Sequence, residues 1–312
     1  MATKAAEAPP PAPAPAPAEL AAAEAAAAAA AEAELTAARG SGWTISFADF
    51  EASPARLVDA LDEWGVAHVR GVCSASECAG WARGLKGFFE GLGTGVTLSE
   101  ELSELQELCP RSRWVVNVGG LCHNFGVAWL PEVWEVRAHH NVRRMFEAIW
   151  GQSELACSFD GVNVDRPKVE TPRKPPVLGL HTDQSPHSSP ADVRYCVQSA
   201  LSLTPTVAAS GGTTVMPGSH RHHRDLLLHQ FPVAEKEYKK DWISLTDDMV
   251  AHLVARGCPV VHVETQPGDL VLWDSRTIHC GRKVRLAVSR SMGRGAVAVR
   301  GWQRCCFAFL CS

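Results

Sequence analysis

An imidazole and a carboxylate stand two residues apart at His181 and Asp183, directly after the apolar run VLGL. In a strand, side chains at positions i and i+2 project to the same side, so the two groups could point together into the mouth of a small barrel. The spacing alone is not specific, because the chain has 13 histidines and repeats the same spacing at His223 and Asp225. An ordinary surface turn is therefore the alternative interpretation of this pair.

His279 is the candidate for a third ligand, since it follows the strand-like segment DLVLWD and a short turn. Two histidines and one carboxylate form the facial triad of non-haem iron(II) oxygenases. Such a triad leaves positions open at which a bidentate 2-oxo acid and O2 can bind. The alternative interpretation of His279 is a buried, hydrogen-bonded histidine of the core.

The second pair, His223 and Asp225, has a different context, because it lies between a polar turn and the apolar start of a helix. Asp225 is there interpreted as an acidic residue near a helix N-terminus, where the helix dipole favours it. His220, His222 and His223 could form a metal-binding tract, but a solvated loop is the simpler prediction. This pair is therefore assigned a structural role.

Helical patterns dominate the part of the chain before residue 151. Capping residues and apolar positions at helical spacing predict three helices, which begin at Ser53–Pro54, Ser74 and about Asn141. Gly65 and Gly151 are the predicted stops of the first and third helices.

After Gly151 the segments become short, rich in Val, Leu, Thr and Ser, and interrupted by Gly and Pro, which indicates strands and turns. Pro267 and Gly268 suit the central positions of a type II turn before the strand DLVLWD. Helices followed by many short strands predict a mainly β protein with flanking helices, of the jelly-roll type.

Composition excludes several classes of protein. The 312 residues are 46% hydrophobic and 21% charged, with a net charge of −4, which predicts a soluble globular protein that does not bind nucleic acid. The longest apolar runs are too short for a bilayer span, so we expect no membrane segment. The 11 cysteines include no CxxC pair, which indicates reduced thiols and a cytoplasmic location.

Five blocks of the sequence carry a family resemblance: SFDGVNV, HTDQSP, VQSALSLTP, GGTTVMPGSH and PGDLVLWDSRTIHCG. Their order and style resemble the phytanoyl-CoA dioxygenase-like branch of iron(II)/2-oxoglutarate oxygenases, over about residues 45 to 283. The resemblance implies a double-stranded β-helix, a cupin-like jelly-roll. It also implies that His181, Asp183 and His279 are the iron ligands, with 2-oxoglutarate as cosubstrate and O2 as oxidant.

The same resemblance implies an arginine about ten residues after the distal histidine. Its guanidinium would bind the far carboxylate of 2-oxoglutarate through two hydrogen bonds. Arg290 stands 11 positions after His279 and is the candidate. Gln198 could hydrogen-bond the cosubstrate or substrate, although ordinary strand polarity explains it equally well.

Both ends of the chain differ in composition from the predicted oxygenase domain at residues 43–283. Residues 1–42 form an Ala/Pro/Glu-rich stretch that predicts a disordered tail. Residues 284–312 contain no Asp, Glu or Lys and show no clear strand pattern. We hypothesise that this atypical tail is intron read-through, in which case the chain lacks a closing strand and leaves an unpaired sheet edge.

The sequence therefore predicts an iron(II)- and 2-oxoglutarate-dependent dioxygenase that hydroxylates a small organic substrate and releases succinate. One alternative is a catalytically inactive jelly-roll, acting as a metal-binding or interaction module or arising as a truncated product. A second alternative is a cupin-like zinc or manganese enzyme, which would use the same fold without an arginine anchor.

Overall fold

The computed structural model describes residues 42–93, 121–122, 124–159, 161–164, 168–169, 179–187, 193–207, 212–232, 241–282, 285–286 and 305–311. Arg290 and residues 1–41 of the predicted N-terminal tail lie outside these ranges. The predictions made for them therefore stay predictions.

The N-terminal elements follow the capping signals of the sequence in part: the predicted cap Ser53 ends one helix, and the next helix begins after Pro54 without a side-chain cap. Strand β1 (Thr44–Ser46) leads into α2 (Phe47–Ala52), α3 (Ala55–Trp64), β2 (Val66–Arg70) and α4 (Ala75–Gly91). The predicted capping box is confirmed, since the side chains of Ser74 and Glu77 each accept a hydrogen bond from the backbone N–H of the other residue. Gly65 ends α3 with a φ of 69°, a left-handed conformation that glycine adopts without strain.

Two further helices follow the 3-10 turn Val127–Trp129, namely α6 (Pro131–Arg137) and α7 (His140–Trp150). Helix α7 is the predicted third helix, and Gly151 ends it with a φ of 65°. Its buried side chains recur at helical spacing: Val142, Met145, Phe146 and Ile149.

The larger sheet, here called the major sheet, has the strand order β1-β2-β11-β7-β14-β4-β3. Its strands beyond β1 and β2 are β3 (Leu121–Cys122), β4 (Val162–Val164), β7 (Val197–Ser202), β11 (Leu270–Asp274) and β14 (Cys305–Cys311). Strands β1 and β2 pair in parallel, whereas the other ladders of this sheet are antiparallel. All residues of β7 and β11 are buried, so these two strands form the centre of the core.

The smaller sheet, here called the minor sheet, has the order β10-β8-β12-β6-β9. Its strands are β6 (His181–Thr182), β8 (Gly212–Val215), β9 (Ile243–Ser244), β10 (Val261–Val263) and β12 (His279–Arg282). Helix α9 (Asp247–Val254) and the helical run formed by α8 (His223–Asp225) and a π turn (Leu226–Gln230) belong to the same part of the chain. They contribute to one cluster of buried side chains with this sheet, which includes Met216, Leu226, Leu227, Ile243, Met249, Leu253 and Ile278.

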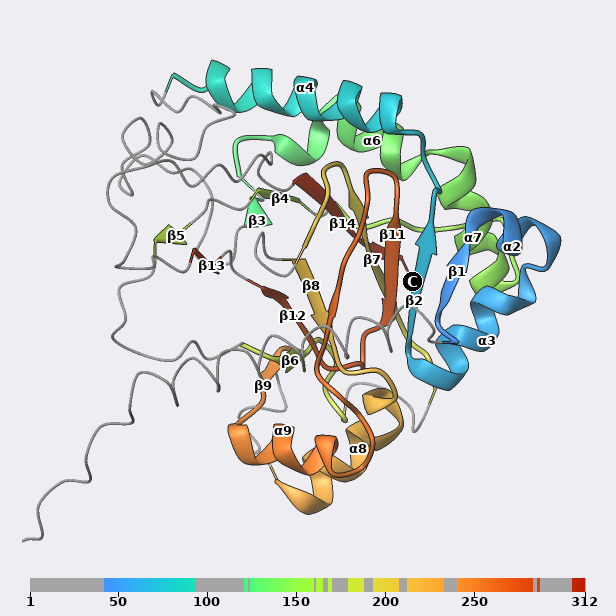
Figure 1. The fold of residues 1–312 in the computed structure, drawn as a ribbon, viewed down its shortest axis with the longest axis vertical. Helices are drawn as coiled ribbons and strands as arrows, with labels where there is room; N and C mark the ends of the chain where they lie inside the picture. The colour runs from blue at the N-terminus through green and yellow to red at the C-terminus, as the bar shows by residue number, and fades with distance from the viewer. Residues whose placement is uncertain are drawn as a thin grey trace, which may run out of the picture. The chain divides into compact units, whose positions relative to one another are not determined.

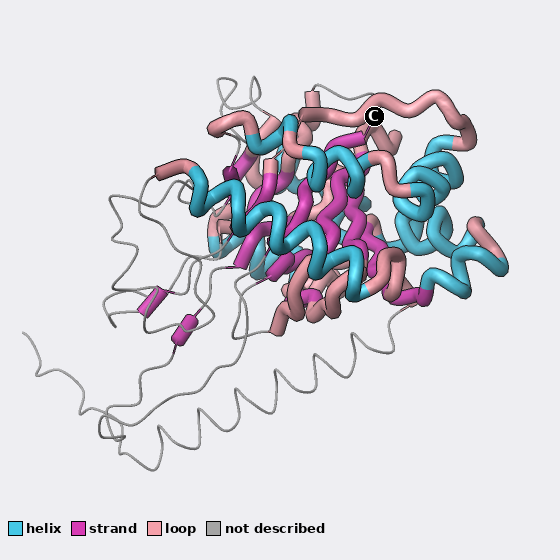
Figure 2. The backbone as a smooth tube through the Cα atoms, turned by 90° about the horizontal axis from the view of Figure 1, so that it is seen from above, coloured by secondary structure: helices cyan, strands magenta, loops and turns pink. Residues whose placement is uncertain are grey.

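Helices flank the major sheet. Figure 1 shows α2, α3 and α7 beside β1 and β2, and α4 with α6 beyond the ends of the central strands. Helix α3 contacts β2 and β11, and α6 contacts β14. Seen from above in Figure 2, α4 runs across the strands. The fold is the expected one, a mainly β double-stranded β-helix with flanking helices.

The predicted turn before β11 is confirmed. The backbone N–H of Asp269 donates to the carbonyl of Gln266 at 3.1 Å, and Gly268 has a φ of 91°. A Cβ atom on Gly268 would lie 1.9 Å from the carbonyl oxygen of Cys73. This position therefore requires glycine for its conformation and for the close approach of the neighbouring backbone.

The C-terminal segment differs from its prediction. Strand β14 pairs antiparallel with β7 on one side and β4 on the other, so the expected unpaired edge at this place is wrong. The run CCFAFLC contains the aromatic residues that favour strands, and its backbone satisfies the N–H and C=O groups of both neighbours. Strand β13 (Arg285–Leu286) pairs with β5 (Lys168–Val169). The read-through hypothesis is a separate statement about the origin of the segment and stays a hypothesis.

None of the helices in the described ranges combines the length and the hydropathy that a membrane span requires.

Candidate metal centre

The structure brings together the three side chains that the sequence predicts as ligands. His181 on β6 and His279 on β12 are directly opposite each other in the antiparallel ladder, and Asp183 lies just beyond the end of β6. The Nε2 atom of His181 lies 3.6 Å from Oδ1 of Asp183, and Nε2 of His279 lies 3.4 Å from Oδ2. One ligand atom from each residue falls within 4.8 Å of the other two. Directly opposite residues share one face of a sheet, which explains this convergence.

Backbone carbonyls fix the orientation of both imidazoles. Nδ1 of His181 lies 2.8 Å from the carbonyl oxygen of Gly179, and Nδ1 of His279 lies 2.9 Å from that of Thr277. A carbonyl oxygen can only accept, so each Nδ1 carries a proton, and in the neutral form of each imidazole the lone pair is on Nε2. The nitrogen atoms that face Asp183 are therefore the ones that can bind a metal when the imidazoles are neutral.

Hydrogen bonds fix both the backbone and the side chain of Asp183. The backbone N–H of Asp183 donates to the carbonyl of Ser275 at 3.1 Å, and the hydroxyl of Thr182 donates to the same carbonyl at 3.0 Å. Nε2 of Gln198 donates to Oδ2 of Asp183 at 2.7 Å. The carboxylate thus has a defined position with Oδ1 turned toward His181.

The protonation states also suit a metal. Burial, together with the adjacent charge of His279, lowers the pKa of His181 to about 4. Burial acts to raise the pKa of Asp183, but hydrogen bonding and charge from His279, then His181 and Gln198, lower it to about 2. Near neutral pH the centre therefore offers the neutral His181 imidazole and an ionised carboxylate, the forms that bind a cation.

The donor set fits a divalent transition metal. Two imidazole nitrogens and one carboxylate oxygen, all on one side, match the facial arrangement that leaves further positions open. Throughout the described ranges, this is the only group of three or more His, Cys, Asp or Glu side chains whose ligand atoms converge in this way. The assignment of these residues as iron ligands is a proposal, developed below.

Gln198 and Trp273 form the inner side of the centre. They are cross-strand partners on β7 and β11, and the indole Nε1 of Trp273 donates to Oε1 of Gln198 at 2.7 Å. The Trp273 ring lies 5.1 Å from the ring of His279. The sequence singled out Gln198 for a contact with cosubstrate, which stays a prediction. The contact of Trp273 with Gln198 could not be predicted, because nothing in the sequence shows where an indole N–H points.

Asn163 on β4 is a partly buried polar residue that sequence reasoning did not single out. Its Oδ1 atom is inaccessible to solvent and has no hydrogen-bond partner among the described residues. Its Nδ2 would lie 3.9 Å from a Cβ atom at Gly281, two residues after His279 on β12. The amide nitrogen therefore faces the strand that carries His279, and the amide oxygen has no hydrogen-bond donor among the described residues.

An exposed indole, that of Trp242, lies beside His181 and forms what is here called the outer side of the centre. The Trp242 ring lies 5.3 Å from the His181 ring at an interplanar angle of 38°, and Trp242 is 53% exposed. The preceding residue, Asp241, accepts a hydrogen bond from the backbone N–H of Ser185 at 3.1 Å, which ties this segment to the loop after Asp183. Each imidazole thus has an indole as a neighbour, an exposed one beside His181 and a buried one beside His279.

The histidine-rich segment after β8 differs from its prediction. His220 and His223 are buried, so the predicted solvated loop is wrong for both, whereas His222 is partly exposed. The ring nitrogen Nε2 of His223 lies 2.8 Å from the carbonyl oxygen of Gln184, and that of His220 lies 3.2 Å from the carbonyl of Asp62. These carbonyls come from distant parts of the chain, which a local sequence pattern cannot reveal.

Asp225 lies in the first turn of the helical run after the polar segment, as predicted. His223 is held at neutral charge, because burial lowers its pKa to about 4. The pair has the structural role that its context indicated.

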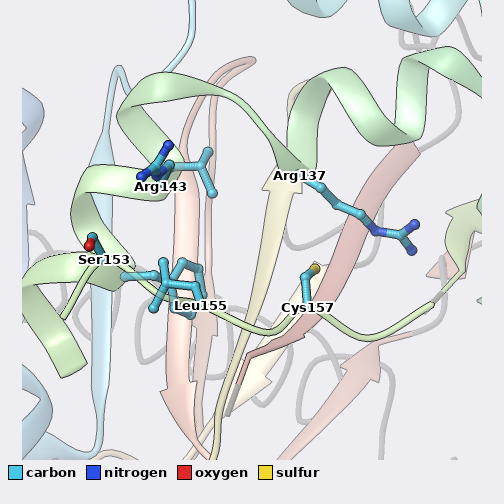
Figure 3. A pocket seen from close by; sticks show the side chains of 7 residues that line it. Arg137, Arg143, Ser153, Leu155 and Cys157 are labelled. Carbon is cyan, nitrogen blue, oxygen red and sulfur yellow. The ribbon is translucent and has the colours of Figure 1, made fainter.

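Figure 3 shows a pocket of about 270 Å³ at the junction of α6 and α7, separate in its lining from the three metal-ligand candidates. Arg137 and Arg143 line it, but their guanidinium groups point away from each other in this view, so they do not converge on one anion. Arg137 instead donates to the carbonyl of Ala128 at 2.9 Å and lies over the Trp134 ring. We assign no ligand to this pocket.

Comparison with known proteins gives a family match. A family model described as phytanoyl-CoA dioxygenase matches residues 61–292. The protein named Ava biosynthesis cluster protein O, from Aspergillus versicolor, is 32% identical over 170 residues, which is 53% of this chain and 53% of that protein. The chain thus spans about half the length of this curated relative.

Solved structures show more distant similarity. AviO1 from Streptomyces viridochromogenes Tue57 aligns with a TM-score of 0.45 and 17% identity, over 83% of this chain and 94% of that one. The carbocyclase SnoK from nogalamycin biosynthesis, described as non-heme and alpha-ketoglutarate dependent, aligns with a TM-score of 0.48 and 17% identity over 81% of each chain.

Proposed function

The chain belongs to the phytanoyl-CoA dioxygenase family, and from this premise we propose that it is an iron(II)- and 2-oxoglutarate-dependent oxygenase that hydroxylates a small organic substrate. Iron, 2-oxoglutarate and O2, which the sequence indicated, are the cofactors of this family. The observation that carries the proposal is the convergence of two imidazole Nε2 atoms and one carboxylate on a single point of the barrel.

In this proposal Nε2 of His181, Nε2 of His279 and Oδ1 of Asp183 hold the iron. When bound, iron and 2-oxoglutarate supply the oxidising chemistry: 2-oxoglutarate loses CO2 to become succinate, and the two atoms of O2 go to succinate and substrate. The role of the protein is to fix the three ligands on one side so that cosubstrate and O2 can reach the other.

The buried and the exposed surroundings of the metal centre suit different roles. On the inner side, Trp273, Gln198 and His279 are buried, which excludes water from the region where an oxidant must not be quenched. On the outer side, the exposed Trp242 provides an apolar wall beside His181, so we propose that substrate approaches there. Arg290 is the proposed partner of the far carboxylate of 2-oxoglutarate. The buried Oδ1 of Asn163, which has no partner among the described residues, is a candidate acceptor for a hydroxyl or amide donor.

The test is anaerobic addition of Fe(II) and 2-oxoglutarate to the purified chain. Bidentate chelation of the 2-oxo acid should produce a weak visible charge-transfer band, and admission of air should then yield succinate. Zn(II) or Mn(II) with 2-oxoglutarate serves as the control and should give neither signal. Absence of both signals with Fe(II) would favour a catalytically silent module over an oxygenase.

A further inference from the structure

Trp273 contacts two of the three groups that converge on the metal centre, one directly and one through Gln198. Its ring lies 5.1 Å from the His279 ring, and its N–H donates to Oε1 of Gln198 at 2.7 Å. Gln198 then donates from Nε2 to Oδ2 of Asp183, also at 2.7 Å. Trp273 and Gln198 are both buried, so these hydrogen bonds lie where water cannot readily replace them.

The indole decides which way the Gln198 amide faces. An amide has a donor end and an acceptor end of nearly the same shape, whereas an indole N–H can only donate. Trp273 therefore requires the oxygen of Gln198 on its side, which leaves the NH2 group facing Asp183. Without the indole N–H, the amide could turn over and direct its oxygen at the carboxylate, replacing an attraction with a repulsion.

The donation from Gln198 also distinguishes the two carboxylate oxygens of Asp183. Oδ2 accepts the amide hydrogen bond, whereas Oδ1 lies on the side of His181. The carboxylate is thereby oriented with one oxygen available to an ion. At the same time the Trp273 ring limits rotation of His279, whose Nδ1 is already fixed by the carbonyl of Thr277.

We propose that Trp273 is a positioning residue that orders the metal centre from the major sheet, acting on Asp183 through the amide of Gln198 and on His279 by ring contact. The two histidines come from strands of the minor sheet, whereas Trp273 and Gln198 come from adjacent strands of the major sheet. The hydrogen-bonded pair therefore joins the two sheets at the place where the ligands converge. This inference rests on the proposed function, since it assumes that the three residues bind a divalent ion.

The experiment uses Co(II) as the probe, because its visible spectrum reports both binding and coordination geometry. Trp273→Phe keeps an aromatic ring beside His279 and removes only the N–H. Gln198→Met keeps the length of the side chain and removes the donor to Asp183. Each single variant should weaken Co(II) binding by about 10- to 100-fold, the usual effect of removing a group that orients a ligand, and should alter the Co(II) spectrum.

The double variant separates a positioning role from general loss of packing. Because Trp273→Phe acts mainly through Gln198, the double variant should bind Co(II) about as well as Gln198→Met alone. Additive losses in the double variant would overturn the connection through Gln198. Urea unfolding of the metal-free variants shows how much stability each change removes, and a change in the Co(II) spectrum at constant stability identifies an effect on the ligands.

Trp81 offers a matched control. Like Trp273 it is 6% exposed, its Nε1 donates to a side-chain oxygen, that of Glu135 at 2.8 Å, and its ring lies 6.0 Å from an imidazole, that of His139. Trp81→Phe should leave Co(II) affinity within about twofold of the wild type, since it loses the same group away from the centre. Unchanged Co(II) affinity and spectrum in Trp273→Phe would overturn the inference alone, whereas absence of Co(II) binding by the wild type would overturn the proposed function and the inference together.

Discussion

The pairs His181/Asp183 and His223/Asp225 have the same spacing but lie in different secondary structure. The first is on strand β6 and the residues just after it, where positions i and i+2 face the same side. The second is in the helical run that begins at His223, where two residues correspond to about 200° of rotation around the helix axis. The side chains of the first pair therefore meet, and those of the second pair diverge.

The two pairs also differ in which imidazole nitrogen is hydrogen-bonded to a backbone carbonyl. Nδ1 of His181 is bonded to a backbone carbonyl, which leaves Nε2 beside the carboxylate of Asp183. In His223 it is Nε2 that faces a carbonyl, that of Gln184, while Asp225 is exposed. A His-x-Asp motif thus indicates a metal site only when a strand aligns the two side chains and the backbone occupies the other imidazole nitrogen.

The largest expected effect is the loss of metal binding on changing the strand pair. Asp183→Ala removes the only carboxylate among the three ligands and should weaken Fe(II) binding by more than about 100-fold, beyond the 10- to 100-fold typical of groups that merely orient ligands. Anaerobic calorimetric titration with Fe(II) measures this. Fe(II) affinity equal to that of the wild type would remove the distinction between the two pairs.

A change at His223, in the helical pair, should instead lower the stability of the protein. His223→Ala leaves a cavity and an unsatisfied buried carbonyl at Gln184, which should lower the free energy of unfolding by about 2 to 4 kcal/mol. Urea denaturation of the metal-free protein gives this quantity. The folded variant should still bind Fe(II) within about tenfold of the wild type, and a loss as large as that of Asp183→Ala would show that His223 belongs to the metal centre.

The pH dependence of stability sharpens the contrast further. Burial lowers the pKa of folded His223 to about 4, below the value of about 6.5 for an unfolded histidine. Between these pH values the unfolded state binds more protons than the folded state. Acidification therefore lowers the free energy of unfolding by up to about 1.4 kcal/mol per pH unit through His223. The contribution of neutral His223 to stability is fully present above about pH 6.5.

His223→Gln keeps a donor for the Gln184 carbonyl and cannot titrate. The free energy of unfolding of this variant should therefore fall less steeply than that of the wild type between pH 6.5 and pH 4. Equal slopes in urea denaturation series would contradict the neutral, buried state of His223.

The smallest effect is expected at Asp225. Its side chain is exposed and stands in the first turn of a short helical run, so Asp225→Ala should change the free energy of unfolding by no more than about 0.5 kcal/mol. Fe(II) affinity should be unchanged. This variant is the matched control for Asp183→Ala, because both remove the carboxylate of a His-x-Asp pair.

The sequence predicted features that depend on local chemistry. The capping box of Ser74 and Glu77, the stop at Gly151 and the turn at Pro267–Gly268 each follow from residues that lie close together in the chain. The convergence of His279 with His181 and Asp183 was predicted from their residue types and the family resemblance. The local features required no knowledge of which distant strands pair, whereas the convergence depends on the pairing of β6 with β12 and was predicted through the family resemblance.

Other features that depend on long-range packing were not predicted. His223 is buried because a carbonyl 39 residues earlier in the chain accepts its hydrogen bond, so the polar character of its own segment was misleading. The role of Trp273 depends on its neighbour on β7, 75 residues away in sequence. Strand β14 was missed because its partners, β7 and β4, are set by the sheet and not by its own pattern.

A crystal structure of the chain loaded anaerobically with Fe(II) would test the central claim most directly. We predict one ion at about 2.0 to 2.2 Å from Nε2 of His181, Nε2 of His279 and Oδ1 of Asp183, with Oδ2 still bonded to Gln198 and His223 still bonded to Gln184. An ion bound elsewhere, or bound at this place without one of the two imidazoles, would contradict the account.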